Sequence, residues 1–290
     1  MRRFAAALAA AVLALTVSAS FAEKLPEPAD RVPEEYTRPA ENGGTVEKIG
    51  YPSRDYAGGG AEVTKRAVVY LPYGYTEENQ YDVLVLCHGS AGDENEWGFT
   101  KDSSIARNIA DHLMEDGAAR PWIIVMPDGR SGGRGENGDI RPFLRFGEEL
   151  RNDLLPWIDA HYSTYGTREH RGMAGLSIGA VQTVNIGLCE CPDLFAFFGA
   201  FSVTRSVYPA ERIAAALEAA GDECPVLLFY SVCGQQDKTA YASAKALAEN
   251  LPGACGQLTA DHRVWQEVPG GHDFSVWYLG LYNFLRLAAN

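Results

Sequence analysis

Short apolar runs alternate with helical patterns along most of this chain, and this alternation limits the fold more strongly than any other feature. Eight runs rich in β-branched or aromatic residues are the candidate strands: Val46–Gly50, Arg66–Leu71, Val83–Cys87, Trp122–Met126, Gly172–Gly175, Ala196–Phe201, Val226–Val232 and Arg263–Val268. Six segments follow a helical period: Ser103–Met114, Glu148–His161, Ile178–Leu188, Ala210–Ala219, Thr239–Glu249 and Val276–Ala288. Such alternation is typical of a mainly parallel sheet with helices on both faces. We therefore predict an α/β fold with an eight-stranded sheet.

Length and composition agree with this fold class. The chain has 290 residues, of which 46% are hydrophobic, and this suffices for one large α/β domain or two small ones. Pro156 lies inside the second helical segment, where it removes a backbone donor and crowds the preceding turn. We expect a kink in that helix.

The N-terminus departs from the alternation. Arg2 and Arg3 precede an apolar run from Phe4 to Val17, and small residues end the stretch at Ala22. This is the three-part pattern of a secretory signal, and the run is shorter than the ~20 apolar residues of a membrane span. We predict a signal peptide over residues 1–22, cleavage after Ala22, and a secreted or periplasmic protein.

Residues 23–44 have the composition of a linker. They carry four prolines and many charges without an apolar period, which is typical of an extended segment rather than a folded unit. The folded domain is therefore predicted over residues 45–290.

The net charge of the chain limits which kinds of molecule it can bind. Loss of Arg2 and Arg3 with the signal peptide changes the formal net charge from −13 to −15, and such an acidic balance repels nucleic acid and anionic membranes. We expect no nucleic acid partner and no membrane association after cleavage. Neutral substrates such as esterified polysaccharides fit this charge better, and the sequence leaves the oligomeric state open.

The stretch GMAGLSIGA, Gly172–Ala180, places Ser177 at the predicted turn from a buried strand into a helix. Such a turn needs small neighbours, because a side chain at Gly175 or Gly179 would strike the adjoining backbone. The helix behind Ser177 presents free N–H groups and a partial positive charge, which stabilise an alkoxide or oxyanion. The pattern G-x-S-x-G also occurs by chance, so the strand–turn–helix setting is what favours a nucleophile over a small turn residue.

A serine nucleophile needs a histidine base and an acid that orients it, and in α/β-hydrolases these follow the serine in the order acid, then histidine. His272 lies in VPGGHDFSVW, directly after the last predicted strand, and Asp237 leaves the preceding strand in VLLFYSVCGQQD. Asp273 is the rival acid, but as the sequence neighbour of His272 it is poorly placed to accept from the ring. The remaining histidines are interpreted as structural: His88, His112, His161, His170 and His262.

An oxyanion hole requires two backbone donors. The first is the N–H of Ile178, and the second is predicted in the loop LCHGSAGDENEW after the third strand, at Gly89 or Ser90. The alternative for this loop is a plain glycine turn. No metal or cofactor is implied, because no histidine, carboxylate or cysteine cluster has ligand spacing.

Six stretches carry a resemblance to a known family: KRAVVYLPYGY (Lys65–Tyr75), HGSAGDENEW (His88–Trp97), MPDG (Met126–Gly129), RGMAGLSIGA (Arg171–Ala180), GQQD (Gly234–Asp237) and GGHDFSVW (Gly270–Trp277). In them the chain resembles the esterase family that includes esterase D-like enzymes and the feruloyl and acetylxylan esterases of carbohydrate esterase family 1. The resemblance covers nearly everything from about Thr45 to Leu287. It implies an α/β-hydrolase fold with Ser177 as nucleophile, Asp237 as acid and His272 as base.

The chain departs from the family pattern at three positions. Ala91 stands where a glycine is usual, and Ile178 and Ala180 replace the commoner methionine and glycine after the nucleophile. These changes can reshape the acyl pocket, but they leave the backbone donors intact.

The specificity region is predicted at Asp128–Gly147, a glycine-rich segment after the fourth strand that should lie over the site. Its apolar residues are candidates to line an acyl pocket: Ile140, Pro142, Phe143 and Leu144. Its arginines are candidates to meet sugar hydroxyls or uronates: Arg130, Arg134 and Arg141. The substrate contacts we predict are Phe143, Arg141 and Trp277. The alternative is a solvated loop that packs only its own apolar residues.

Six cysteines in an exported chain allow disulfides, although a reducing niche would leave thiols. Four of them are expected at the sheet edge opposite the site, where two bridges could form: Cys189, Cys191, Cys224 and Cys255. Cys87 and Cys233 end strands that the expected order separates by roughly 14 Å, beyond the ~7 Å limit between bridged α-carbons. We interpret both as buried thiols.

These features predict a secreted serine carboxylic-ester hydrolase. The family resemblance points to removal of feruloyl or acetyl groups from plant cell-wall polysaccharides or oligosaccharides through an acyl-enzyme. One alternative is other chemistry on the same three residues, in a siderophore esterase, an acyltransferase or a peptidase. A second is a carbohydrate-binding protein without turnover, which the intact set of Ser177, Asp237 and His272 argues against. The predicted export signal disfavours thioester hydrolysis of glutathione conjugates, because that substrate is cytosolic.

Overall fold

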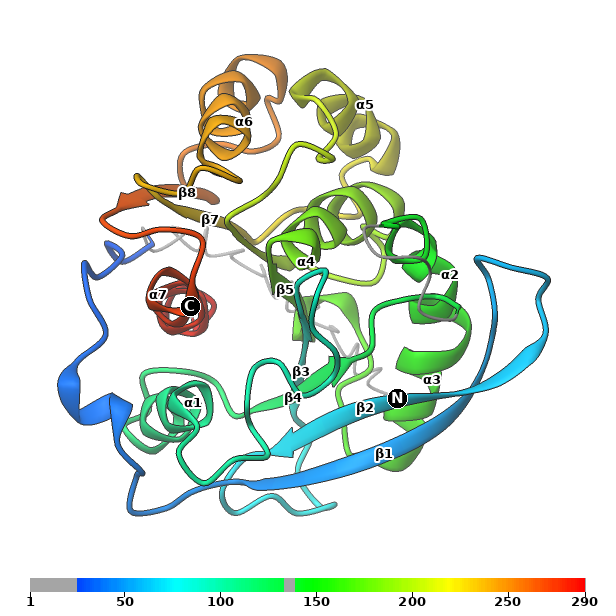
Figure 1. Ribbon diagram of the computed structural model, residues 1–290, viewed down its shortest axis with the longest axis vertical. Coiled ribbons are helices and arrows are strands. Elements are labelled where there is room, and N and C mark those ends of the chain that lie inside the picture. The colour runs from blue at the N-terminus through cyan, green and yellow to red at the C-terminus, as the bar shows by residue number, and fades with distance from the viewer. Residues whose placement is uncertain (1–24, 133–138, 290) are drawn as a thin grey trace, which may run out of the picture.

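The computed structural model describes residues 25–132 and 139–289, so the predicted signal peptide lies outside the described residues. A single eight-stranded sheet forms the centre of the molecule, in the order β1-β2-β4-β3-β5-β6-β7-β8 (Figure 1). The pairs β1–β2 and β2–β4 are antiparallel, and the other five pairs are parallel. The predicted mainly parallel eight-stranded sheet is confirmed.

All eight predicted strands are present: β1 (Thr45–Arg54), β2 (Glu62–Leu71), β3 (Asp82–Cys87), β4 (Trp122–Pro127), β5 (Arg171–Leu176), β6 (Phe197–Phe201), β7 (Leu228–Gly234) and β8 (Arg263–Val268). The first is five residues longer than predicted and the second four, because every residue of β1 has a partner in β2. Their hairpin reaches past the carboxyl end of β4, where Pro127 is paired with Ala67.

Helices cover both faces of the sheet. They are α1 (Ile105–Glu115), α2 (Phe146–Glu149), α3 (Leu155–His161), α4 (Ile178–Gln182), α5 (Ala210–Ala220), α6 (Tyr241–Ala254) and α7 (Phe274–Leu287). Short 3-10 segments are η1 (Glu34–Thr37), η2 (Phe143–Arg145) and η4 (Arg168–His170), and π-helical segments are η3 (Leu150–Leu154) and η5 (Thr183–Glu190). Helices α1 and α7 lie on one face, and α2 to α6 lie on the other (Figure 1).

Strand β3 shows why both faces are apolar. Leu84 and Leu86 belong to the core under α1 and α7, whereas Val83 and Val85 belong to the core under the other helices. Successive side chains of a strand point to opposite faces, so a strand buried on both sides is a continuous apolar run rather than an alternating one. This is why the sequence pattern identified the central strands.

The predicted helix Glu148–His161 is continuous but changes its hydrogen-bond register. It runs from α2 through the π-helical η3 into α3, and Pro156 lies in the first turn of α3. The proline has no N–H to donate, and the wider π turns directly before it accommodate this loss. The helix after Ser177 changes register in the same way, from α4 to η5.

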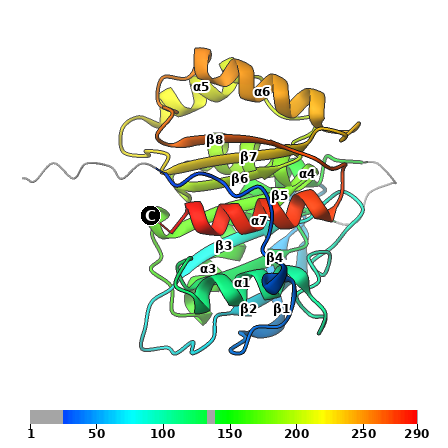
Figure 2. The same cartoon turned by 90° about the vertical axis from the view of Figure 1, so that its left-hand side faces the viewer.

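Residues 25–44, predicted as a linker, run along the face formed by α1 and α7 (Figure 2). Tyr36 donates its hydroxyl to Asp116 and stacks on His112, with 4.8 Å between ring centroids. Further along, Asn283 of α7 exchanges hydrogen bonds with the backbone of Ala29. The segment is largely extended, with η1 as its one helical turn among the described residues.

All six cysteines are free thiols in this structure, so none of the bridges considered among Cys189, Cys191, Cys224 and Cys255 is present. Cys87 and Cys233 are fully buried. They lie on β3 and β7, which β5 and β6 separate. The prediction of two buried, unpaired thiols is confirmed.

Candidate active site

Ser177 occupies a sharp turn at the carboxyl end of β5. Its φ is 56° and its ψ is −113°, a left-handed conformation that is costly for a residue with a side chain. The glycines around it are required by space. A Cβ on Gly175 would lie 2.7 Å from the carbonyl carbon of Gly179, and a Cβ on Gly179 would lie 2.7 Å from the His88 oxygen. The sequence-based reason for this pair of glycines therefore agrees with the structure.

A continuous hydrogen-bonded chain links Ser177 to two other predicted residues. Ser177 Oγ lies 3.0 Å from His272 Nε2, and His272 Nδ1 lies 2.7 Å from Asp237 Oδ2. Asp237 follows β7, and His272 lies between β8 and α7. Because parallel strands end at the same edge of the sheet, three residues distant in sequence meet there.

Asp237 is an almost completely buried carboxylate, 2% exposed. Its Oδ1 accepts from the N–H groups of Thr239, at 2.9 Å, and Ala240, at 2.8 Å. Burial raises the pKa of Asp237, but hydrogen bonds from His272, Ala240 N–H and Ser202 together hold it below its usual value. The acid is therefore ionised at neutral pH and fixed in orientation, as a group that orients an imidazole must be.

The rival acid, Asp273, is directed elsewhere. Its Oδ1 accepts from Ser275 N, at 2.9 Å, and its Oδ2 accepts from Gly271 N, at 3.2 Å. Asp273 is the N-cap of α7, a position in which aspartate satisfies unpaired helix donors. The choice of Asp237 over Asp273 thus agrees with the hydrogen bonds of both carboxylates.

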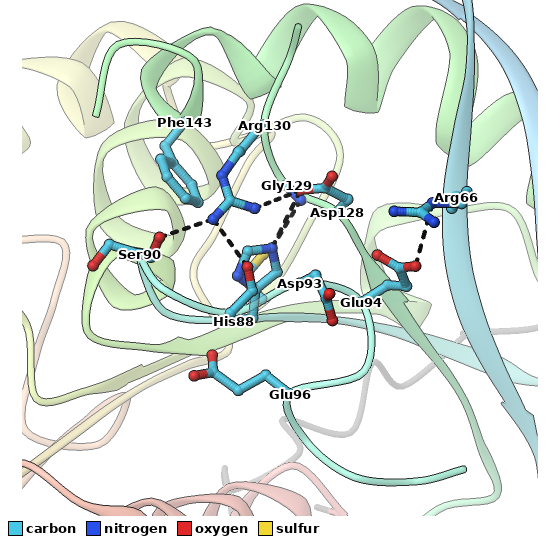
Figure 3. A network of polar contacts seen from close by, with 12 residues as sticks. Arg66, His88, Ser90, Asp93, Glu94, Glu96, Asp128, Gly129, Arg130 and Phe143 are labelled. Carbon is cyan, nitrogen blue, oxygen red and sulfur yellow. Dashed lines mark hydrogen bonds and ion pairs between the residues drawn. The ribbon is translucent and has the colours of Figure 1, made fainter. Parts of the chain in front are cut away.

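The loop that follows β3 supplies the candidate oxyanion donors (Figure 3). Gly89 N–H donates to Glu96 Oε2 at 2.6 Å, so this amide is already engaged. The N–H groups of Ser90 and Ile178 donate no hydrogen bond to another residue in the part of the chain that the structure describes. Of the two predicted alternatives, the geometry therefore favours Ser90 over Gly89.

Arg130 joins this loop to the segment after β4. Its guanidinium donates to the carbonyl oxygens of Ser90, at 2.8 Å, and Gly92, at 2.9 Å, and to Asp128 Oδ1 at 2.8 Å. Figure 3 shows it between the two loops, beside the ring of Phe143, whose centroid lies 4.6 Å from the guanidinium carbon. Arg130 is 6% exposed. The expectation that it meets sugar was wrong, because its donors are directed into the protein.

His88 makes a second link between the same loops. Its Nδ1 lies 2.6 Å from the carbonyl oxygen of Gly89, and its Nε2 accepts from Gly129 N–H at 3.3 Å. The side chain is buried. His88 is therefore a structural, hydrogen-bonded histidine, as interpreted from the sequence.

Beneath the segment after β4 lies a buried polar cluster, which we call the loop junction and which consists of Tyr51, Lys65, Arg130, Ser131 and Glu149. Glu149 accepts from Tyr51 at 2.6 Å and from Ser131 at 2.9 Å, and it lies 3.8 Å from Lys65 Nζ. Lys65 in turn donates to the carbonyl oxygen of Arg130. Burial is the main cause that raises the pKa of Glu149, to about 7, against the opposing effect of Lys65.

The structure does not bring the predicted substrate contacts to one open surface. Phe143 is 1% exposed and packs against Arg130 and His88. Trp277 is 7% exposed, and its ring meets the His272 ring edge-on. Both rings are buried and pack against residues of the site instead of facing the solvent. The apolar sequence pattern alone could not distinguish this position from the wall of a substrate pocket. Arg141 is 85% exposed and paired with Asp139.

Other parts of the predicted specificity region also differ from expectation. Pro142 is buried, whereas Ile140 and Leu144 are half-buried, and both pack against the core. Arg134 lies outside the described residues.

Sequence reasoning missed two residues that contact the site. Glu96 holds the Gly89 amide, and Ser202 lies beside Asp237 at the end of β6. The sole sequence signal for Ser202 is its place directly after a strand whose carboxyl end faces the site. For Glu96 we find no local signal.

The strand order, the turn at Ser177 and the chain from Ser177 to Asp237 are those of the α/β-hydrolases, the class predicted from the sequence. Comparison with known families then places the protein within that class. The family model described as "Putative esterase" matches residues 62–286. The chain belongs to this esterase family.

Two curated relatives share part of their length with the chain. It is 31% identical over 176 residues to endo-1,4-beta-xylanase Y of Acetivibrio thermocellus, a match that covers 57% of this chain and 15% of that protein. It is 35% identical over 143 residues to an endo-1,4-beta-xylanase/feruloyl esterase of Xylanibacter ruminicola, with 47% and 19% covered. The chain thus spans less than a fifth of either relative.

Solved structures of similar size match nearly the whole chain. A CE1 ferulic acid esterase from the anaerobic fungus Anaeromyces mucronatus gives a TM-score of 0.77 at 26% identity, over 92% of this chain and 99% of that one. A mutant of the feruloyl esterase module from Clostridium thermocellum, complexed with sinapinate, gives 0.77 at 25% identity, over 91% and 94%. These likenesses confirm the predicted fold. Within the described residues, no helix combines the length and apolar character needed to cross a bilayer.

Proposed function

We propose that this protein hydrolyses carboxylic esters through an acyl-enzyme, with Ser177 as nucleophile, His272 as base and Asp237 as the orienting acid. One observation carries the proposal. Ser177 Oγ, 3.0 Å from His272 Nε2, stands on a strained turn whose glycines leave no room for side chains. Strain of this kind persists where the surrounding structure holds a residue for a functional purpose.

The proposed reaction proceeds in two halves. His272 Nε2 takes the proton of Ser177 as Oγ attacks the ester carbonyl, and Asp237 stabilises the imidazolium that forms. The N–H groups of Ile178 and Ser90 donate to the developing oxyanion. The tetrahedral intermediate then collapses, and the C–O bond to the alcohol breaks as His272 returns the proton to the leaving oxygen. Water, deprotonated by His272, next attacks the acyl carbon. The bond from that carbon to Ser177 Oγ then breaks as His272 returns the proton to Oγ, which releases the acid and restores Ser177.

For the substrate we propose feruloyl or acetyl esters of plant cell-wall polysaccharides or their oligosaccharides, met outside the cytoplasm. Feruloyl esterases among the similar structures, and a relative named as both xylanase and feruloyl esterase, support this class. The net charge of −13 disfavours polyanionic partners. Arg141, an exposed residue of the segment after β4, is the side chain we propose for contact with the sugar.

The nucleophile is tested by Ser177→Ala. We expect the variant to lose nearly all hydrolysis of p-nitrophenyl acetate and all labelling by a fluorophosphonate probe, because no other hydroxyl contacts His272 in the described structure. Circular dichroism and thermal unfolding should match the wild type. Undiminished labelling of the folded variant would exclude Ser177 as the nucleophile.

The substrate class is tested separately, by comparing kcat/KM for methyl ferulate, acetylated xylo-oligosaccharide, p-nitrophenyl acetate and a siderophore ester. We expect the highest value on the feruloyl or the acetyl-sugar ester. Activity confined to p-nitrophenyl acetate, or highest on the siderophore ester, would refute the cell-wall substrate and leave the serine esterase chemistry standing.

A further inference from the structure

Two residues with side chains adopt the left-handed backbone conformation in the part of the chain that the structure describes. They are Ser177 and Ser202, each with a φ of 56°. This conformation costs a non-glycine residue free energy that glycine would avoid. The strain at Ser177 is explained by the nucleophile turn, whereas the strain at Ser202 has no such explanation. A serine kept where glycine would be unstrained suggests that its hydroxyl is needed.

Ser202 follows β6, the strand between those that carry Ser177 and Asp237. Its backbone N–H donates to Val232 O at 2.8 Å, which ties the turn to β7. Its side chain is completely buried. The hydrogen bond to β7 therefore holds the left-handed conformation of Ser202 in place, and the hydroxyl lies in the protein interior.

The proton of the Ser202 hydroxyl can be assigned from its neighbours. Trp277 Nε1 lies 3.1 Å from Ser202 Oγ, and an indole N–H is a donor only. Ser202 Oγ must therefore accept from Trp277, which leaves its own proton available for the Asp237 carboxylate, whose pKa Ser202 helps to lower. The Cys233 thiol lies 3.7 Å from Asp237 Oδ2 and 3.9 Å from Ser202 Oγ, and it closes the group.

We propose that Ser202 is a positioning residue, whose hydroxyl is oriented by Trp277 and fixes the Asp237 carboxylate against His272. The Trp277 ring also meets the His272 ring edge-on, at 5.1 Å between centroids. One indole thus contacts the base directly and the acid through Ser202. The inference rests on the proposed function, because it assigns Ser202 a role in orienting that same histidine.

The groups that face Asp237 come from four segments. They are His272 from the loop before α7, Cys233 from β7, Ser202 from the end of β6, and the N–H groups of Thr239 and Ala240. His272 is the sole cationic candidate among them, and burial raises the pKa of Cys233 to about 12. Asp273 is directed toward Ser275 and Gly271 instead. Loss of the Ser202 donor therefore acts on the pair of Asp237 and His272.

The test is Ser202→Ala, measured as kcat, KM and the pH profile of kcat/KM on p-nitrophenyl acetate. We expect kcat to fall roughly tenfold with little change in KM, as for loss of one hydrogen bond to a charged group. The acidic limb of the profile, which reports protonation of the essential base, should move to higher pH. Without the Ser202 donor, more negative charge remains on Asp237, and this favours the protonated, inactive imidazole.

Two further variants separate the hydroxyl from the backbone. Ser202→Gly relieves the left-handed strain, so we expect it to be as impaired as Ser202→Ala while unfolding at an equal or higher temperature. Trp277→Phe keeps an aromatic ring and removes the indole donor, and it should shift the acidic limb in the same direction by a smaller amount. These two variants also cover the case in which Ser202→Ala fails to fold.

Ser53→Ala is the matched control, because Ser53 is also buried and its Oγ donates to a carboxylate, Asp153, at 2.7 Å, away from His272. It should leave the pH profile unchanged. Wild-type kcat and an unmoved acidic limb in Ser202→Ala, or full activity in Ser202→Gly, would overturn the inference. Either result could occur while Ser177→Ala is inactive, so failure of the inference is distinguishable from failure of the proposed function.

Discussion

Two buried carboxylates, Asp237 beside His272 and Glu149 at the loop junction, have pKa values shifted in opposite directions although both are almost inaccessible to solvent. Burial raises the pKa of each. At Asp237, hydrogen bonds from His272, Ala240 N–H and Ser202 more than offset burial, and its pKa falls below the usual value. At Glu149, Lys65 and the two hydroxyls offset less, and its pKa rises to about 7.

The comparison shows that the kind of donor, rather than the depth of burial, decides which carboxylate stays charged. Asp237 receives backbone N–H groups and an imidazole that gains a proton in the proposed mechanism. Glu149 receives two hydroxyls, and its cationic neighbour stands 3.8 Å away. The donors around Asp237 favour a charged carboxylate, whereas the surroundings of Glu149 also accommodate a protonated, neutral carboxyl group. Variants at the two carboxylates and at the loops beside them test this contrast.

The largest effect is expected from Asp237→Asn. An amide at this position favours the wrong histidine tautomer, so we expect kcat on p-nitrophenyl acetate to fall by about 10³–10⁴-fold with the fold retained. The matched control is Asp273→Asn, whose carboxylate caps α7 and does not contact the ring of His272. It should cost far less activity. If the two variants came out in the reverse order, Asp273 would be the orienting acid.

A smaller effect is expected where the loop junction meets the loop after β3, Leu86–Trp97, which we call the oxyanion loop because it carries the proposed donor Ser90. Arg130→Lys should lower kcat roughly tenfold, less than the ~10²–10³-fold that deletion of an oxyanion donor costs. One ammonium cannot reproduce the planar fork that holds the oxygens of Ser90, Gly92 and Asp128 together. The pH profile of kcat/KM should stay in place, because the pair of Asp237 and His272 is untouched.

Arg151→Ala is the control for this prediction, since Arg151 forms an exposed ion pair with Asp193 away from both loops. It should retain wild-type kcat. Full activity in Arg130→Lys would show that the oxyanion loop keeps its shape without the guanidinium of Arg130. The role given to Arg130 would then be wrong.

The smallest effect is expected in the stability of Glu149→Gln, measured as urea midpoints from pH 5 to pH 8. The folded pKa of Glu149, about 7, lies above its ordinary value. Its contribution to stability is therefore complete below the unfolded pKa and is lost as the pH rises through about 7. We expect the wild-type midpoint to decline over this range and the decline to be shallower in the variant.

Glu148→Gln is the neighbouring control, because Glu148 is half-exposed and paired with Arg145 at the surface. Its midpoints should follow the wild-type decline. Equal pH dependence in Glu149→Gln and the wild type would show that Glu149 does not titrate near neutral pH, and the contrast with Asp237 would fail.

Much of the fold could be predicted because its signals are local. The central strands are continuous apolar runs buried on both faces, and Gly175 and Gly179 mark the turn at Ser177. The hairpin extension of β1 and β2 was missed, since polar residues there pair beyond the covered part of the sheet. Register changes at η3 and η5 were also missed, because a π turn and an α turn have similar sequence patterns.

In the candidate site, too, the residues with local sequence signals could be predicted and the others could not. Ser177, Asp237 and His272 could be placed because each directly follows a predicted strand, and parallel strands bring their carboxyl ends to one edge. Arg130 and Phe143 were expected at the substrate, yet they bind to each other and to the oxyanion loop. Residue type and segment gave no information on which way these side chains point.

The sequence was sufficient to predict the layered α/β architecture, the turn at Ser177 and the order of Ser177, Asp237 and His272 along the chain. Only the folded structure shows that Arg130 donates to the loop after β3, that Glu96 accepts from the Gly89 amide, and that Ser202 accepts from Trp277. The reason is physical. Periodicity and turn chemistry act over a few residues, whereas the partner of a buried polar group is set by whichever distant segment packs beside it, 40 residues away for Arg130 and 75 for Ser202.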